Sequence, residues 1–402
     1  MDYPGSALER AMRIQEVVMR AMTGQIQWFQ AAEILGVSCR TIRRWKEHFE
    51  RSGYDAFIDR RRQHPSPRRV AVPVVQEVVR LYRKRYADLH VKHFHEKLTT
   101  EHGIDQSYTW VKTVLQKAGL VEHRPRRGKH RRRRPRRPLP GMLLHLDASR
   151  HGWMPLCPEQ QDDLLVLMDD ASNHVYEALL VPEENTWSVM RVLYDCIRRH
   201  GVFCSLYTDR ASHFAFTPVR GQPPDKGRLT QVGRALQQLG VDHILAHSPQ
   251  ARGRSERLFG TWQKRLPQEL RLHGIRDRDA ANAFLRRHFI PWHNRTLTVK
   301  PEQLGTAFVP LVDKTVLDRV LCLEFNRVVA NDNTVAYGKR ALQIASSRYR
   351  FSFARTQVTV REHLDGRLSV WHGPRVIGRY DAEGRALVET PKPSPQKVGG
   401  VA

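Results

Sequence analysis

The chain has 402 residues, of which 67 are Lys or Arg and 41 are Asp or Glu, giving a formal net charge of +26 at pH 7. This length predicts several domains, and this charge predicts a polyanionic partner, most often nucleic acid. No apolar run approaches a membrane span, and the first residues lack the basic and apolar regions of a signal peptide, so neither a membrane span nor a signal peptide is expected.

The cysteine pattern points to a reducing compartment. The five cysteines are scattered, odd in number and without Cys-x-x-Cys spacing: Cys39, Cys157, Cys196, Cys204 and Cys322. Neither a disulfide framework nor a structural zinc site is indicated, so we expect a cytoplasmic protein.

Residues 1–62 have the pattern of a helix-turn-helix DNA-binding domain. The small Ala31 lets two helices cross closely, Gly36 suits the turn, and Ser38 can cap the second helix. That helix would present four basic side chains to a DNA major groove: Arg40, Arg43, Arg44 and Lys46. An ordinary helical hairpin with a basic face is the alternative.

Residues 70–123 predict a second helical block. Apolar residues repeat at helical spacing in two stripes, one of Val75, Val78, Val79 and Tyr82 and one of Tyr108, Val111, Val114 and Leu115. We predict a second helix-turn-helix-like DNA-binding domain, with Lys112 near the DNA. The motif is weaker here, and a purely structural bundle is the alternative.

Residues 124–138 form a basic linker with ten Lys or Arg and no acidic residue. Like charges at this density repel one another into an extended chain that can track the phosphate backbone of DNA. The candidate DNA-binding residues of the linker are Arg126, Arg127, Lys129, Arg131, Arg132, Arg133 and Arg134.

Residues 139–310 have a sequence pattern that is typical of an α/β domain. Three successive strands precede a helix, a strand, a helix, a strand and a final helix, which is the order of a ribonuclease H-like core. The predicted elements are strands 143–148, 164–168 and 175–181, helix 186–200, strand 203–208, helix 230–239, strand 243–246 and a helix opening at Ser248. In that last helix Leu258, Trp262 and Leu266 repeat at helical spacing, and a further helix over 277–293 is expected to pack back on the core.

Three acids stand out in this core. Asp147 and Asp209 each end a short apolar strand, and Glu256 lies early in the final helix. Phosphoryl transfer on nucleic acid can use two Mg²⁺ ions about 3.5–4 Å apart, bound by hard oxygen ligands. We predict that Asp147 bridges both ions and that Asp209 and Glu256 each bind one. Arginines surround Glu256 in the sequence, so pairing of surface charges is the alternative interpretation of this residue.

Other polar residues near these strands have simpler interpretations. Asp169 and Asp170 fit ordinary turn chemistry, the pair 162–163 is expected to be solvated, and Glu177 is expected on an exposed face. The histidines near two of the acids, His213 and His247, could contact substrate but fit local structure better.

Residues 311–385 become rich in alternating, strand-like sequence, with a strong hairpin turn at Asp365-Gly366. We predict a small SH3-like β-barrel that contacts DNA or partner subunits; a simple structural cap is the alternative. The tail over 386–402 is expected to be disordered.

Three segments resemble bacterial insertion-sequence transposases of the DDE class, close to the ISNCY-type group: the strand of Asp147, Tyr207–Phe214 around Asp209, and above all Ser248–Gln263 around Glu256. The resemblance implies a retroviral integrase-like catalytic core that uses Mg²⁺ or Mn²⁺ for hydrolysis and strand transfer. It also implies that Asp147, Asp209 and Glu256 are the catalytic and metal-binding triad. Ser255 and Trp262 replace the more common valine and leucine of the family.

The resemblance further implies double-stranded DNA partners, namely the terminal inverted repeats of the element and the target DNA. Arg252 and Arg254 would then lie along DNA at the active site. Because transposition holds two ends together, a homodimer or higher oligomer on DNA is expected, in the bacterial cytoplasm at the nucleoid, with no membrane partner. The alternatives are a sequence-specific DNA-binding regulator with an inactive integrase-like core, and a nuclease without strand transfer.

Overall fold

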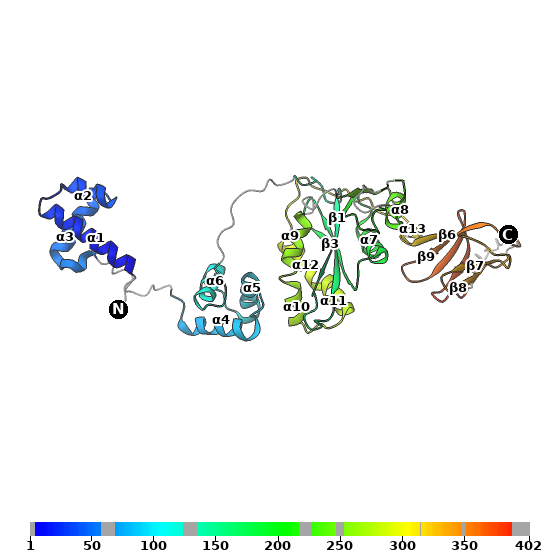
Figure 1. Cartoon of the computed structure of the whole chain (residues 1–402), viewed down its shortest axis with the longest axis horizontal. Helices are drawn as coiled ribbons and strands as arrows, with labels where there is room; N and C mark the ends of the chain where they lie inside the picture. The colour runs from blue at the N-terminus through cyan, green and yellow to red at the C-terminus, as the bar shows by residue number, and fades with distance from the viewer. Residues whose placement is uncertain are drawn as a thin grey trace, which may run out of the picture. The chain divides into compact units, whose positions relative to one another are not determined.

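A computed structural model describes residues 5–57, 69–123, 135–216, 225, 227–246, 253–313, 315–346 and 350–387 (Figure 1). The chain divides into two compact units, Met1–Leu81 and Tyr82–Ala402. None of the helices in these ranges is both long and apolar enough to cross a lipid bilayer.

The first unit contains the predicted helix-turn-helix. Its elements are α1 (Gly5–Met22), α2 (Trp28–Leu35), α3 (Cys39–Ser52) and η1 (Gly53–Phe57). Ala31 is fully buried, and Gly36 ends α2 at φ +62°, where a side chain would be strained. The Ser38 hydroxyl accepts a hydrogen bond from the Thr41 N–H at the start of α3. The predicted motif and its capping residues are therefore confirmed.

A second group of helices comprises α4 (Val72–Arg85), α5 (Val91–His102) and α6 (Tyr108–Lys117). Phe94 and Leu98 of α5 are fully buried, as are Val111 and Leu115 of α6. The Ser107 hydroxyl caps α6 by accepting from the Trp110 N–H. Two residues of the second predicted apolar stripe thus lie in a core, as an amphipathic helix requires.

The central sheet has five strands in the order β3-β2-β1-β4-β5. They are β1 (Leu144–His151), β2 (Asp162–Asp169), β3 (Val175–Val181), β4 (Ser205–Thr208) and β5 (Asp242–Leu245). β1, β2 and β3 pair antiparallel, whereas β4 pairs parallel to both β1 and β5. This is the strand arrangement that the predicted ribonuclease H-like order requires.

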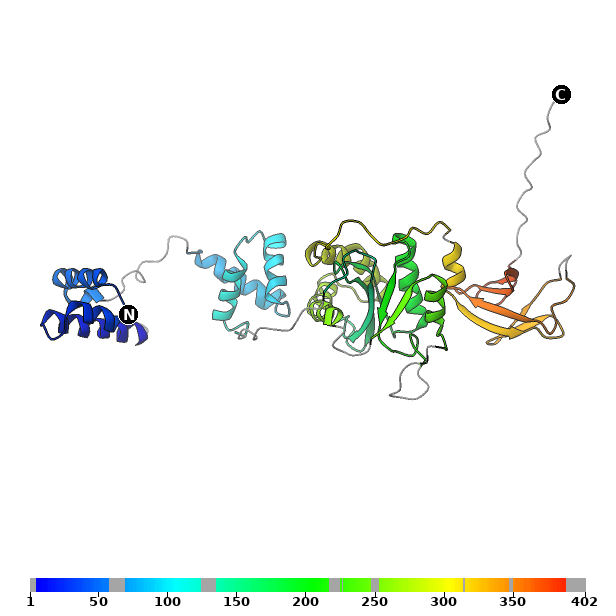
Figure 2. The same ribbon diagram turned by 90° about the horizontal axis from the view of Figure 1, so that it is seen from above.

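Helices cover both faces of this sheet (Figures 1 and 2). On one face Leu144 and Leu146 pack with α7 (Thr186–His200) and α8 (Gln231–Gln238). On the other face Val166 packs with Trp262 in a second apolar core. The helical elements of that second face are α9 (Gly253–Trp262), α10 (Leu266–Leu272), α11 (Arg278–Phe284), the π-helix η4 (Leu285–Phe289) and α12 (Ile290–Thr296).

Two predicted helices differ in detail from the structure. The periodic residues Leu258, Trp262 and Leu266 are all buried, but Leu266 begins a new helix because α9 ends at Trp262. The predicted helix over 277–293 is α11, η4 and α12 in succession, with a π-helical stretch just before Pro291, whose nitrogen cannot donate a hydrogen bond. The predicted opening at Ser248 lies outside the described residues.

The C-terminal part begins with α13 (Thr315–Val320) and continues as two sheets around one apolar core. A four-stranded sheet has the order β11-β10-β9-β6, and β7 pairs with β8. The strands are β6 (Leu323–Val328), β7 (Thr334–Tyr337), β8 (Arg340–Gln343), β9 (Gln357–Glu362), β10 (Leu368–His372) and β11 (Arg375–Tyr380). The predicted hairpin turn joins β9 to β10, with Gly366 at φ +83°.

Candidate active site and DNA interface

Asp147 lies on β1, on the sheet face that α9 covers. It is paired with Val166 of the antiparallel neighbour, and paired residues share a face of the sheet. Val166 belongs to the core beneath α9, whereas Leu146 beside Asp147 belongs to the core beneath α7. Asp147 is therefore an acid on an otherwise packed face, with only 8% of its surface exposed.

Asp209 directly follows β4, the parallel neighbour of β1. The register pairs Leu144 with Leu206 and His145 with Tyr207, and its continuation for two more residues would bring Asp147 opposite Asp209. Neighbouring strands lie about 4.8 Å apart. The Asp209 Oδ1 accepts from the Ala211 N–H at 2.9 Å, which orients this carboxylate at the strand end.

Glu256 lies on α9, which runs beside β1. Near its start, Arg254 forms an ion pair with Asp170, whose Oδ1 lies 2.8 Å from His145 Nε2 on β1. Just after its end, Gln263 donates to Ser149 Oγ at 3.0 Å. Nine helical residues advance about 13.5 Å, and four strand residues advance about 13 Å. The exposed Glu256, between these anchors, therefore lies along the stretch of β1 that contains Asp147.

The side chains of the three acids are not gathered into a ready-made metal cage. Within the described ranges, no group of three or more His, Cys, Asp or Glu side chains could hold a metal ion. The donor set nevertheless fits Mg²⁺ or Mn²⁺, because three carboxylates supply the hard oxygen atoms that such ions prefer. A cation that drew the three carboxylates together would also offset their mutual repulsion.

Three acids that were expected to be solvated are buried, so those predictions are wrong. Glu177 is 2% exposed and pairs with Arg199, and burial raises its pKa while Arg199 opposes the rise. Glu177 is paired with Leu167 in the regular register of β2 and β3, which puts it on the face that α7 covers; the β-bulge follows this pair, between Leu167 and Met168. Asp162 and Asp163 are also buried. Asp162 forms an ion pair with Arg278 at 2.8 Å, and Asp163 accepts a hydrogen bond from the Glu184 N–H.

Asp169 and Asp170 differ from each other. Asp169 has the predicted turn role, since its Oδ1 accepts from both the N–H and the hydroxyl of Ser172. Asp170 instead contacts Arg254 and His145. This function of Asp170 had no signal in the local sequence, because both of its partners are distant in the chain.

The two histidines near the acids were expected to be local structure. His213 lies 3.2 Å from Glu184 through its Nε2, which agrees with that interpretation. His247 lies outside the described residues.

The predicted DNA-facing residues of α3 lie on its outer surface. Arg40, Arg43 and Arg44 are exposed, while Lys46 is half-buried, 3.6 Å from Glu50 and over the ring of Trp28. Lys112 on α6 is exposed as well. Arg252 and the seven linker residues Arg126, Arg127, Lys129, Arg131, Arg132, Arg133 and Arg134 lie outside the described residues.

Arg254 was expected along DNA, but its guanidinium is engaged inside the core. It pairs with the buried Asp170 and donates to the Pro135 carbonyl at 3.0 Å, and its side chain is 20% exposed. The carboxylate of Asp170 thus competes with any phosphate for this side chain.

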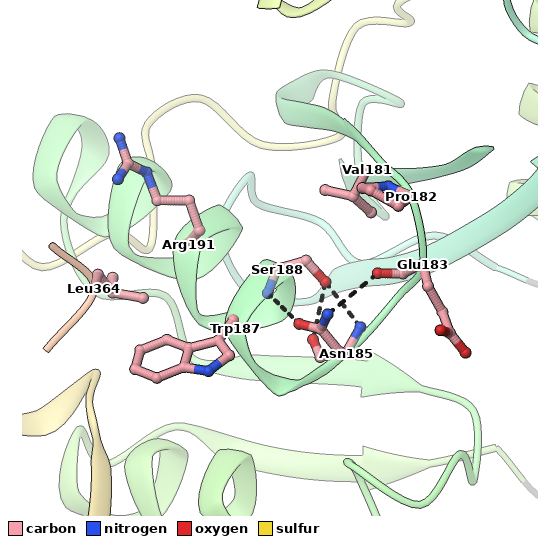
Figure 3. A pocket seen from close by; sticks show the side chains of 8 residues that line it. All are labelled: Val181, Pro182, Glu183, Asn185, Trp187, Ser188, Arg191 and Leu364. Atoms are coloured by element: carbon pink, nitrogen blue, oxygen red, sulfur yellow. Dashed lines mark hydrogen bonds between the residues drawn. The ribbon is translucent and has the colours of Figure 1, made fainter. Parts of the chain in front are cut away.

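A surface pocket lies at the start of α7 (Figure 3). Asn185 caps the helix there by accepting from the Ser188 N–H, and the Ser188 hydroxyl accepts from the Asn185 N–H. The lining residues are Val181, Pro182, Glu183, Asn185, Trp187, Ser188, Arg191 and Leu364. None of the three predicted catalytic acids contributes to it, so the pocket is separate from the candidate site.

We expect Arg43→Ala to weaken DNA binding, because it removes an exposed cation from the predicted recognition helix. If Arg43 contacts one phosphate, the slope of log affinity against log salt should fall by about 0.9. Fluorescence anisotropy over a salt series measures this slope, with Arg10→Ala on α1 as the matched control. An unchanged slope and affinity for Arg43→Ala would place the DNA elsewhere.

Comparison with known proteins adds independent observations. A family described as winged helix-turn helix matches residues 15–73. "Putative transposase y4bF" of Sinorhizobium fredii is 30% identical over 370 residues, covering 91% of this chain and 79% of that protein. The transposase for insertion sequence IS1202 of Streptococcus pneumoniae is 28% identical, covering 62% of this chain and 61% of that protein.

Solved structures with some likeness include a simian T-cell lymphotropic virus intasome in complex with PP2A regulatory subunit B56 gamma. It is 14% identical with a TM-score of 0.32, covering 73% of this chain and 95% of that chain. The HTLV-2 integrase catalytic core domain in complex with magnesium is 16% identical with a TM-score of 0.29, covering 41% of this chain and 93% of that one. At these TM-scores neither likeness carries an argument.

A helix-turn-helix joined to a sheet of ribonuclease H-like order defines a DNA-binding protein with an α/β core of a nucleic-acid-processing kind. The extent of the match to the Sinorhizobium fredii relative is decisive, and the chain belongs to the transposase family, a family of polynucleotidyl transferases.

Proposed function

We propose that this chain is a DNA transposase that binds the ends of an insertion sequence and catalyses metal-dependent strand cleavage and strand transfer. The proposal is supported by the parallel pairing of β1, which carries Asp147, with β4, which Asp209 follows. It is supported further by the contacts that hold the helix of Glu256 beside β1.

The three carboxylates are proposed as the ligands of two Mg²⁺ or Mn²⁺ ions, with Asp147 bridging both. Such ions, when bound, activate the attacking hydroxyl and stabilise the leaving oxygen. The carboxylates hold the charge of the site on a packed sheet face, where only small movements are available to Asp147. Glu256 is the exposed member, so we propose that DNA and cations draw its helix turn toward the strands.

DNA recognition is proposed for the helices and the linker. The exposed Arg40, Arg43 and Arg44 suit a major groove, and Lys46 flanks them. Lys112 would contact the DNA from α6, and the linker residues and Arg252 would follow the phosphate backbone. The C-terminal sheets around one core suit a small SH3-like barrel that contacts DNA or a second subunit.

The proposed domains are 1–62 and 70–123 for DNA binding, 124–138 as linker, 139–310 as catalytic core, 311–385 as barrel and 386–402 as tail. A dimer or larger assembly on DNA is proposed because two element ends must be held together. The substrates would be the terminal inverted repeats and the target DNA.

A second candidate function is a DNA-binding regulator with an inert core. It is favoured by one observation, the lack of a three-acid ligand cluster within the described ranges. The helix-turn-helix alone would serve such a protein.

The deciding experiment incubates the full chain with labelled duplex carrying a candidate element end, in Mg²⁺ or in EDTA, beside a scrambled duplex. We expect cleaved and joined products only with the element end and Mg²⁺. Binding of the end with no product under any divalent-ion condition would support the regulator and overturn the enzyme. Light scattering of the same complexes measures the assembly, and a strict monomer on end DNA would contradict the oligomer.

A further inference from the structure

The carboxylate of Asp170 is enclosed by groups from three separate parts of the core. Its side chain is 1% exposed. His145 Nε2 on β1 lies 2.8 Å from its Oδ1, Arg254 on α9 pairs with the same oxygen, and the Arg137 N–H donates to its Oδ2 at 2.8 Å. With both oxygens engaged in this way, Asp170 is itself a poor candidate for a metal ligand.

The partners of Asp170 connect to each of the three predicted catalytic acids. Arg254 precedes Glu256 by two residues, and His145 precedes Asp147 by two residues on the same face of β1. The His145 ring lies 5.1 Å from the ring of Tyr207, centroid to centroid. Tyr207 precedes Asp209 by two residues on β4. One line of contacts, Arg254–Asp170–His145–Tyr207, thus joins the helix and both strands that carry the acids.

The charge of Asp170 is essential to this connection. A buried carboxylate is stable only when its partners offset the cost of removing it from water. Arg254 comes from α9, which carries the exposed Glu256, whereas His145 and Tyr207 belong to the sheet. Without the carboxylate, the first turn of α9 loses its anchor to β1, and Gln263 remains at the far end.

Resting on the proposed function, we propose that Asp170 is a positioning residue that holds Glu256 in register with Asp147 and Asp209 through Arg254 and His145. It contacts neither DNA nor cation. Residues that orient ligands in this way typically change metal affinity or activity by about 10–100-fold when replaced.

The test uses the full chain and three variants. Asp170→Asn removes the charge of the buried carboxylate. Arg254→Gln removes the same ion pair by replacing its more exposed partner. Asp169→Asn is the matched control, because Asp169 is an equally buried carboxylate that binds the Gly141 N–H and Ser172. Mn²⁺ binding, measured by electron paramagnetic resonance, and cleavage of end DNA are compared with amide hydrogen exchange of α9.

We expect Asp170→Asn and Arg254→Gln to weaken Mn²⁺ binding by about 10-fold, to slow cleavage, and to speed exchange in the first turn of α9. Asp169→Asn should retain Mn²⁺ affinity. The double variant Asp170→Asn with Arg254→Gln leaves no unpaired charge and should regain part of the loss.

Wild-type Mn²⁺ affinity and unchanged α9 exchange in Asp170→Asn would overturn the positioning role. An equal loss in Asp169→Asn would do so too, since the effect would then be structural. If the wild-type chain binds no Mn²⁺ and cuts no end DNA, the proposed function fails instead. The exchange comparison still decides in that case whether Asp170 anchors α9.

Discussion

Asp147→Asn is expected to reduce cleavage of element-end DNA by at least about 100-fold, more than the loss of an orienting partner usually costs. The amide keeps the shape of the side chain but supplies one neutral oxygen in place of a carboxylate. Since Asp147 is proposed to bridge both ions, the loss should exceed that of Asp209→Asn or Glu256→Gln. DNA-end binding, which belongs to other parts of the chain, should be unaffected.

The matched control is Asp242→Asn, an exposed acid on β5 of the same sheet. Gel assays of end cleavage and anisotropy measurements of end binding, both on the full chain, separate chemistry from recognition. Cleavage at the wild-type rate in Asp147→Asn would remove this residue from the site. Equal loss in Asp242→Asn would show that the assay reports general damage to the sheet.

The second large effect concerns Glu269, a buried acid where α10 meets α5. His93 Nε2 lies 2.8 Å from its Oε1, and Lys97 Nζ lies 3.2 Å from its Oε2. Beside them, Arg265 pairs with Glu96 at 2.6 Å. Burial alone would raise the pKa of Glu269, but the hydrogen bond and charge of His93 and the charge of Lys97 outweigh it and lower the pKa to about 2.

We expect Glu269→Gln to lower the opening free energy of α5 and α10 by about 3 kcal/mol, the lower end of the range for breaking a buried ion pair. Native-state hydrogen exchange measures this locally, without assuming that the whole chain unfolds in one step. The exposed Glu302→Gln is the control and should change little.

The same contact predicts a pH dependence. The folded pKa of Glu269 lies below its ordinary value of 4.5, so the ionised carboxylate contributes stability above that value. This contribution is lost as the pH falls from about 4.5 toward 2. The difference between wild type and Glu269→Gln should shrink over this window. A difference that stays constant down to pH 2 would contradict the ion pair.

Local sequence was sufficient for the elements whose causes are local. The bounds of β3 and α7 were predicted without error, since an apolar run and a capped amphipathic stretch define them. The first helix-turn-helix could also be predicted, because its capping contacts join residues that are close in the chain, such as the hydrogen bond from the Thr41 N–H to the Ser38 hydroxyl. Asp147 and Asp209 could be selected because each follows a short run of apolar residues, although β1 continues past Asp147 to His151.

Burial of the other acids could not be predicted in the same way. Glu177 alternates with apolar residues, which favours an exposed face, but α7 covers the face on which it lies, and Arg199 of α7 pairs with it. The break between α9 and α10 likewise depends on packing, because Leu266 keeps the helical spacing of Leu258 and Trp262.

The sequence by itself predicted the first helix-turn-helix, the succession of strands and helices in the core and three candidate catalytic acids, because periodicity, capping and motif spacing act over a few residues. Only the tertiary structure decided which distant groups meet. The pairing of Arg254 with Asp170 joins residues 84 positions apart (254 − 170), and the pairing of Glu269 with His93 joins residues 176 positions apart. A buried charge is paired with groups that lie near it in space. Those groups can be far away in the sequence, so the local sequence does not reveal the pair.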